Sequence, residues 1–194
     1  MQTINLNKAV AMIPDGATVM VGGFMGVGTP ERLIDELVRQ QRRNLTIIAN
    51  DNALPGIGIG KLVTAGLVRK TIASHIGLNP ETQQKMIEKS MEVELIPQGT
   101  LIERIRAAGY GLGGILTATG VGTVVEEGKQ KIEVDGNTYL LETPLRADFA
   151  LVQAFLCDYL GNLTMCLRLA ILTLLSRWQQ TLSSSMQSIL CLLA

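Results

Sequence analysis

The sequence has 194 residues, a length that fits a single large domain with its own hydrophobic core. It carries 17 basic residues, 17 acidic residues and one His, and aromatic residues make up 4% of it. This balance argues against a nucleic-acid-binding protein, which carries a basic excess. The first residues lack the basic start and long apolar core of a secretory signal. The longest charge-free stretch near the C-terminal end, residues 178–194, is interrupted by Gln, Thr and Ser, so it is a poor membrane span. We therefore expect a cytoplasmic protein that binds neither nucleic acid nor a membrane. Three cysteines without CxxC spacing and a single His also predict no metal site.

Short apolar runs alternate with amphipathic segments along the chain. Residues 19–21 form an apolar run typical of a buried strand, and a helix is expected after the glycine-rich residues 22–28, with Thr29 as its cap and Pro30 at its first position. The other elements expected are strands over 45–49, 68–73, 93–96 and 149–154, helices over 79–90 and 101–108, and a hairpin over 131–142 that turns at Asp135-Gly136. This alternation predicts an α/β fold with an open, mostly parallel sheet flanked by helices. Ligands of such sheets bind past the carboxyl ends of the strands.

The glycine-rich segment is the strongest local signal for a binding site. Glycines let a backbone approach a ligand closely and expose its amides, and a following helix adds partial positive charge. The segment is not the dinucleotide fingerprint, because Thr29 and Pro30 follow Gly28, and it lacks the Lys of a P-loop. A simple tight strand-to-helix turn remains an alternative.

The stretch from Asp15 to Pro30, with Gly22-Gly23-Phe24 at its centre, resembles the first-subunit motif of the family I CoA-transferases. The resemblance extends over residues 1–164, and its further matching segments are residues 48–51, 75–80, 97–104, 119–122, 126–129 and 145–148. It implies a CoA-transferase-like fold. Within the family the motifs are most similar to alpha subunits that act on acetate, acetoacetate or butyrate, and the sequence does not distinguish these acids.

The resemblance also implies a reaction and a partner. In this family a glutamate carboxylate attacks an acyl-CoA thioester, and CoA passes through a glutamyl-CoA thioester to a second carboxylate. That glutamate belongs to a Ser-Glu-Asn-Gly motif, which this chain lacks. Glu126 and Glu127 precede a glycine, but their polar surroundings make neither a good nucleophile candidate. We therefore expect no catalytic nucleophile here, a beta subunit that supplies it in an α2β2 assembly, and CoA or acyl-CoA as a substrate rather than a permanently bound cofactor.

The resemblance assigns two sets of site residues to this chain. Asn50 and Gln98 match positions that face the reacting centre, where their amides can donate hydrogen bonds to an oxyanion or orient a carboxylate. Both can instead satisfy the backbone of local turns, and this alternative stays open. The CoA-associated residues are Gly22, Gly23, Phe24, Met25, Gly26, Val27 and Gly28.

The resemblance stops after residue 164, which divides the chain into a C-terminally incomplete alpha-subunit domain over 1–164 and an atypical apolar tail over 165–194. The tail has two Arg and no acidic residue, Gly or Pro. One hypothesis is a frameshift near codon 165, because another reading frame of residues 170–181 permits family-like segments. The alternative is a divergent apolar helix. Two further functions stay open: an inactive subunit with a disrupted end, and a nucleotide-binding α/β module.

Overall fold

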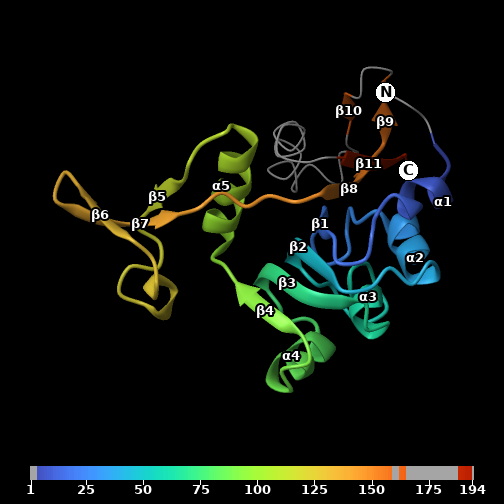
Figure 1. The fold of residues 1–194 in the computed structure, drawn as a ribbon, viewed down its shortest axis with the longest axis horizontal. Helices are drawn as coiled ribbons and strands as arrows, with labels where there is room; N and C mark the ends of the chain where they lie inside the picture. Colours follow the sequence, from blue (N-terminus) through green and yellow to red (C-terminus); the bar gives the residue numbers. More distant parts are fainter. Residues whose placement is uncertain (1–3, 159–161, 165–187, 194) are drawn as a thin grey trace.

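The computed structural model describes residues 4–158, 162–164 and 188–193, and a six-stranded sheet lies at its centre (Figure 1). The strand order is β11-β8-β1-β2-β3-β4, and every neighbouring pair is parallel. The strands are β1 (Thr18–Val21), β2 (Leu45–Asp51), β3 (Val68–His75), β4 (Glu92–Leu95), β8 (Phe149–Ala154) and β11 (Ser188–Leu193). The predicted α/β fold with a parallel sheet is confirmed.

Helices cover both faces of this sheet. Successive residues of a strand point to opposite faces, and apolar side chains on each face pack under the helices. Val19 and Val21 belong to one core cluster with α1, α2 and α3, whereas Met20 between them belongs to a second cluster under α5. The helices are α1 (Leu6–Ala11), α2 (Glu31–Arg39), α3 (Gly60–Thr64), α4 (Pro80–Ile87) and α5 (Gln98–Gly109). Continuous burial along β2 follows from this two-sided cover.

Helix α2 starts one residue later than the sequence predicts. Pro30 is the N-cap rather than the first helical residue, and the predicted capping role of Thr29 is wrong, since no side chain caps this helix. The Thr29 side chain is buried and lies against Gly23, where an added Cβ would stand 2.3 Å from its Oγ1. Thr29 therefore packs against the glycine-rich loop.

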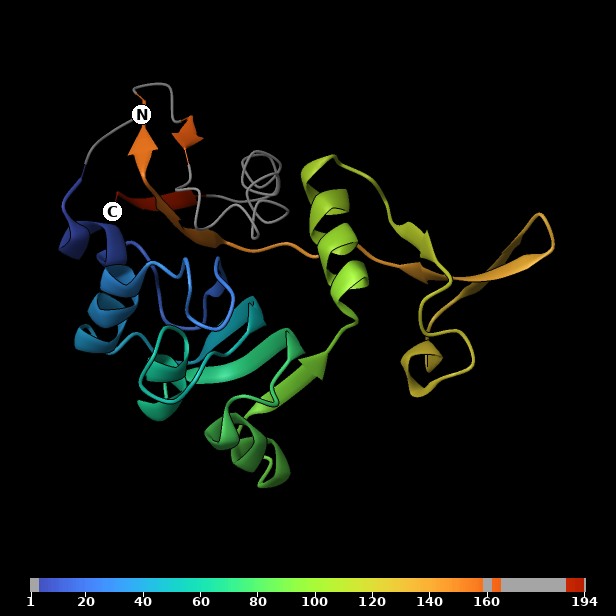
Figure 2. The ribbon, with the colours of Figure 1, turned by 180° about the vertical axis from the view of Figure 1, so that it is seen from behind.

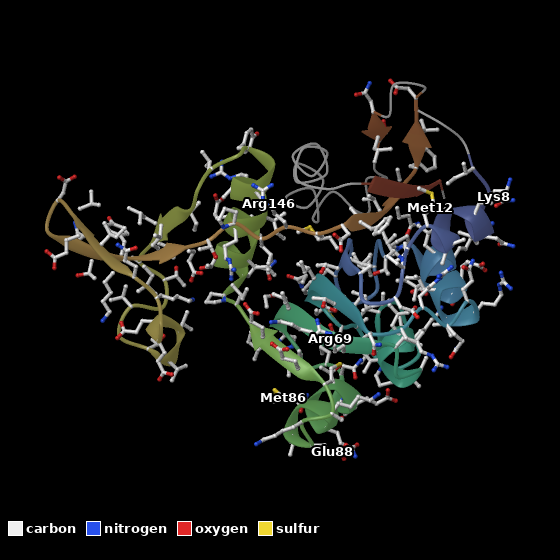
Figure 3. The ribbon with its side chains drawn as sticks, viewed as in Figure 1. Lys8, Met12, Arg69, Met86, Glu88 and Arg146 are labelled. Carbon is white, nitrogen blue, oxygen red and sulfur yellow. The ribbon has the colours of Figure 1, made fainter. Side chains whose placement is uncertain are left out.

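Helices α4 and α5 have shifted boundaries. The predicted cap of α4 is confirmed, because the Asn79 side chain accepts a hydrogen bond from the amide of Thr82, but the helix ends at Ile87 rather than near residue 90. Met86, labelled in Figure 3, lies in the last turn of α4. Helix α5 begins at Gln98, three residues before the predicted start, so Gln98 is a helical residue rather than part of a turn.

An antiparallel arm projects from the end of α5, away from the parallel sheet (Figure 2). It contains β5 (Ile115–Thr117), the 3-10 helix η1 (Val124–Glu126), β6 (Lys131–Val134) and β7 (Asn137–Glu142), in the strand order β5-β7-β6. The predicted hairpin is confirmed, and Asp135 and Gly136 have φ values of 50° and 73° at its turn. Positive φ at both central residues is the geometry that joins two twisted strands most directly.

Charged side chains tie the arm to α5. The carboxylate of Glu142, at the end of β7, is 2% exposed and pairs with Lys129 at 2.5 Å and with Arg104 of α5 at 3.8 Å. Arg104 also donates to the carbonyl of Thr143 at 2.7 Å. The connection from β7 back to β8 carries Arg146, labelled in Figure 3 beside α5. Glu142 therefore links three segments through one buried carboxylate.

The C-terminal part adds a short hairpin and one sheet strand. Strands β9 (Leu156–Cys157) and β10 (Leu163–Thr164) pair antiparallel, and β11 pairs with β8 at the edge of the main sheet. The apolar helix considered as an alternative for the tail rests on the spacing of Leu167, Ile171, Leu174 and Leu175, which lie outside the described residues. Over the described part of the chain, no helix has the length and apolar character needed to cross a membrane.

Candidate functional site

Four segments meet at the carboxyl edge of the parallel sheet. The glycine-rich loop follows β1, Asn50 and Asp51 end β2, Ser74 lies one residue before the end of β3, and Gln98 begins α5 after β4. Because the strands are parallel, their carboxyl ends share one edge, where ligands of open α/β sheets bind. The fold thus places the two predicted side chains, Asn50 and Gln98, on the same edge of the sheet as the predicted loop.

The glycine-rich loop is a tight turn held by its own backbone. Phe24 and Val27 exchange two hydrogen bonds, of 3.0 Å from the Phe24 amide and 2.9 Å from the Val27 amide. Met25 and Gly26, between them, have φ values of 52° and 85°. An added Cβ at Gly26 would lie 2.6 Å from Ile57 Cγ2, so this position requires glycine for both space and conformation.

The amides of this loop divide into two groups. The amides of Phe24 and Val27 each donate to the carbonyl of the other residue. The amide of Gly22 donates to the carbonyl of Leu151. The amide of Met25 donates to the carboxylate of Asp51. Among the residues that the structure describes, three loop amides donate to no partner, and they belong to Gly23, Gly26 and Gly28. These three N–H groups can donate hydrogen bonds to an anionic or carbonyl oxygen of a ligand.

Asp51 fixes the base of the loop. Its carboxylate is 4% exposed and accepts hydrogen bonds from the amides of Met25 (3.0 and 3.2 Å) and Ala53 (2.7 Å), and from Asn50 Nδ2 (2.9 Å). A buried carboxylate needs such donors to offset the loss of its hydration. Asp51 lies in the matching segment 48–51, but the sequence predicts no site role for it. Its position at the carboxyl end of a strand, beside a glycine-rich loop, is the signal that could have found it.

Asn50 and Gln98 are joined through Ser74. The Ser74 hydroxyl lies 2.9 Å from Gln98 Oε1, 2.8 Å from the Asn50 carbonyl oxygen and 3.2 Å from Asn50 Oδ1. Asn50 is 5% exposed, whereas Gln98 is exposed. Asn50 therefore belongs to the buried frame of the site, and Gln98 is the member of this group that reaches solvent.

The N-terminus of α5 adds to the electrostatics of this edge. Pro97 precedes the helix without providing a side-chain cap, so the first amides of α5 contribute partial positive charge next to Gln98. The hydroxyl of Thr100, in the same helical turn, is buried and has no hydrogen-bond partner among the described residues. The edge is thus suited to a negatively charged or strongly polar ligand.

The two glutamates considered in the sequence lie elsewhere, on the arm. Glu126 ends η1 and accepts a hydrogen bond from the Gly122 amide at 2.7 Å, and it pairs with Lys131 at 2.9 Å. The Gly122 amide, followed by Lys131, holds the pKa of Glu126 below its ordinary value. Glu127 follows η1 directly. The carboxylate of Glu126, held by these donors, is a weaker nucleophile than a free carboxylate.

The sequence is similar to those of known proteins. The family model described as "Coenzyme A transferase" matches residues 3–175. The chain is 61% identical over 161 residues to the acetate CoA-transferase subunit alpha of Escherichia coli strain K12, and this match covers 83% of the chain and 73% of that protein. It is 56% identical over 159 residues to the alpha subunit of the acetoacetyl-CoA:acetate/butyrate CoA transferase of Clostridium acetobutylicum, covering 82% of the chain and 73% of that protein.

A solved structure shares the fold. The crystal structure of an acyl-CoA transferase from E. coli O157:H7, in a thioester complex with CoA, superposes with a TM-score of 0.77 at 25% identity. The match covers 97% of this chain and 42% of that chain.

Proposed function

Because this chain belongs to the coenzyme A transferase family, we propose that it is the alpha subunit of a two-subunit enzyme that moves CoA from an acyl-CoA to a free short-chain carboxylate. The observation that carries this proposal is the 61% identity to an acetate CoA-transferase alpha subunit over 83% of the chain. The acids proposed are acetate, acetoacetate and butyrate, which the names of the two curated relatives include. The same identity disfavours the two alternatives, an inactive subunit and a nucleotide-binding module.

The reaction divides between two chains. A glutamate carboxylate of the beta subunit attacks the thioester carbonyl, CoA leaves as a thiolate, and a mixed anhydride remains. The thiolate then attacks the glutamyl carbonyl of this anhydride, which releases the first carboxylate and forms a glutamyl-CoA thioester. The second carboxylate reverses these steps and leaves with CoA. Splitting the transfer in this way replaces one difficult step by easier ones.

This chain contributes hydrogen-bond donors to that reaction. The unpaired amides of Gly23, Gly26 and Gly28 are proposed to contact the acyl-CoA, and Gln98 is proposed to contact the carboxylate. Donors fixed in advance stabilise the negative charge that develops on oxygen in the tetrahedral states. CoA is a substrate in this scheme, so no cofactor stays bound between turnovers. We propose an α2β2 assembly that works in the cytoplasm.

Reconstitution of the two-chain complex tests whether the beta subunit supplies the nucleophile. The chain is co-expressed with a candidate beta chain that carries a Ser-Glu-Asn-Gly motif, and CoA exchange between acetyl-CoA and acetoacetate is measured. We expect exchange only when both chains are present. Hydroxylamine trapping followed by peptide mass spectrometry is expected to label the glutamate of the beta chain. Activity of this chain alone, with a label on one of its own glutamates, would contradict the proposal.

Two glycine variants test the role of the loop. Gly23→Ala places a Cβ 2.3 Å from Thr29 Oγ1 and 2.9 Å from the Thr29 amide nitrogen, at a φ of 121°. The matched control is Gly16→Ala, at a φ of 80° with no atom within 4 Å of the new Cβ. We expect kcat/KM for acyl-CoA to fall about tenfold or more for the first variant, since about 1.4 kcal/mol of lost binding gives that factor. The control should stay within about twofold, because its strain lies outside the loop. Equal losses in both variants would count against the loop.

A further inference from the structure

We propose that Ser74 is a positioning residue that orients the side-chain amide of Gln98 toward the substrate carboxylate. This inference rests on the proposed function. Ser74 Oγ lies 2.9 Å from Gln98 Oε1, between Gln98 and the buried Asn50. The motif resemblance assigns site roles to Asn50 and Gln98, but none to Ser74.

The hydrogens available around Ser74 limit how Gln98 can be oriented. A serine hydroxyl donates one hydrogen and accepts others, whereas a carbonyl oxygen only accepts. Ser74 has three oxygen neighbours, two of them on Asn50 and one on Gln98. Between Ser74 Oγ and Gln98 Oε1 the serine therefore provides the only hydrogen. When this hydrogen points to Gln98, the Gln98 NH2 group is turned away from Ser74.

The opposite arrangement presents the wrong group to the substrate. If the Ser74 hydrogen turns to the Asn50 carbonyl, the Gln98 amide rotates so that its NH2 donates to Ser74 Oγ. Gln98 then presents its carbonyl oxygen outward. A carboxylate accepts hydrogen bonds and does not donate them, so it binds only the arrangement in which the NH2 group points outward. In the structure Gln98 Oε1 faces the Ser74 hydroxyl, which therefore stabilises the competent orientation of Gln98.

The same hydrogen bond connects Gln98 to the glycine-rich loop. The loop amide of Met25 donates to Asp51, Asn50 Nδ2 donates to Asp51, and Asn50 contacts Ser74. Because Asn50 and Asp51 are 5% and 4% exposed, this frame is shielded from water. Buried polar groups that are hydrogen-bonded to one another hold their geometry well. Ser74 extends that rigid frame to an exposed side chain.

The test is a double-mutant cycle in the reconstituted two-chain complex. The variants are Ser74→Ala, Ser74→Thr, Gln98→Ala and the double variant Ser74→Ala/Gln98→Ala. The matched control is Ser90→Ala, an exposed serine whose hydroxyl donates to the Lys85 carbonyl at the end of α4. The readouts are kcat/KM for acetate and the Kd of free CoA, which carries no acyl group for Gln98 to contact.

We expect Ser74→Ala to lower kcat/KM for acetate roughly three- to tenfold, the effect of losing one neutral hydrogen bond. The Kd of CoA should change less than twofold, and Ser74→Thr should retain most of the activity. In the Gln98→Ala background, removing the Ser74 hydroxyl should have no further effect, because Ser74 acts through Gln98. Additive losses in the double variant, or equal weakening of acetate and CoA, would overturn the inference.

A second readout separates this inference from the proposed function. In the 15N-labelled full chain, the side-chain NH2 resonances of Gln98 are identified by their loss in Gln98→Ala. We expect Ser74→Ala to shift them and Ser90→Ala to leave them in place. If the wild-type complex transfers no CoA, the proposed function fails while this shift still decides whether Ser74 orients Gln98. Unshifted resonances would refute the role of Ser74.

Discussion

Replacement of Asp51 by Asn tests whether this buried carboxylate holds the glycine-rich loop. Asp51 accepts hydrogen bonds from three donors, namely the amides of Met25 and Ala53 and the side chain of Asn50. Asparagine keeps the shape of the side chain but replaces one oxygen by an NH2 group. One oxygen faces the Ala53 amide at 2.7 Å and the other faces Asn50 Nδ2 at 2.9 Å. Whichever way the new amide turns, its NH2 group therefore faces another donor.

The cost follows from the number of bonds lost. A hydrogen bond to a charged group contributes about 1.5–3 kcal/mol, and a buried donor left without a partner adds a desolvation cost. Asp51→Asn loses one such bond outright and weakens the bond to Met25, so we expect a loss of about 2–4 kcal/mol in the free energy of unfolding. This is a large part of the 5–15 kcal/mol typical of a domain. The matched control is Asp15→Asn, an exposed carboxylate that accepts the Arg43 amide at 2.8 Å, with an expected loss of less than about 1 kcal/mol.

Urea unfolding of the full chain measures this difference, with a lowered midpoint and an unchanged slope expected for Asp51→Asn. Hydrogen exchange localises it, because the amide of Met25 keeps only a weaker, uncharged acceptor and should exchange faster than in the wild-type chain. If Asp51→Asn is no less stable than Asp15→Asn and the loop amides exchange at wild-type rates, Asp51 does not anchor the loop.

Two further predictions concern groups outside the site. Glu142→Ala leaves Lys129 and Arg104 without their shared carboxylate. We expect the free energy of unfolding to fall by about 2 kcal/mol and Tm by about 4–8 °C, with faster protease cleavage in the arm. An unchanged Tm and cleavage rate would show that the arm is held by other contacts. For Glu36, hydrogen bonds from Arg39 hold the pKa at about 2, below its ordinary value of 4.5. Its ionised form therefore stabilises the fold fully above pH 4.5 and loses this effect as the pH falls toward 2. In denaturation curves between these pH values, Glu36→Gln should show a weaker dependence on pH than the wild type, and identical curves would contradict the assignment.

Local patterns predicted most elements of the sheet. The apolar runs over 45–49 and 149–154 were identified as buried strands, and each lies within an observed strand. The turn at Asp135-Gly136 was also correct, because positive φ at two adjacent positions is a local property. Helix starts were less accurate. Pro30 was placed inside α2, and Gln98 was placed before α5, because tertiary packing shifts helix ends by a few residues.

The sequence predicts two polar side chains of the candidate site, but not the hydrogen bonds that connect them. The motif resemblance pointed to Asn50 and Gln98 as equivalent polar groups, but the fold buries Asn50 and exposes Gln98. The roles of Asp51 and Ser74 were missed, because each depends on partners that lie far away in the sequence. The Met25 amide is 26 residues from Asp51, and Gln98 is 24 residues from Ser74.

The sequence by itself determined the family, the parallel α/β order of strands and helices, and the absence of a Ser-Glu-Asn-Gly motif from this chain. These properties depend on local periodicity and on motif residues that stand close together. Only the tertiary structure decided which loop amides stay unpaired, and which polar side chain at the strand ends reaches solvent. Those outcomes depend on hydrogen bonds between neighbouring parallel strands, whose ends meet at one edge only after the sheet has formed.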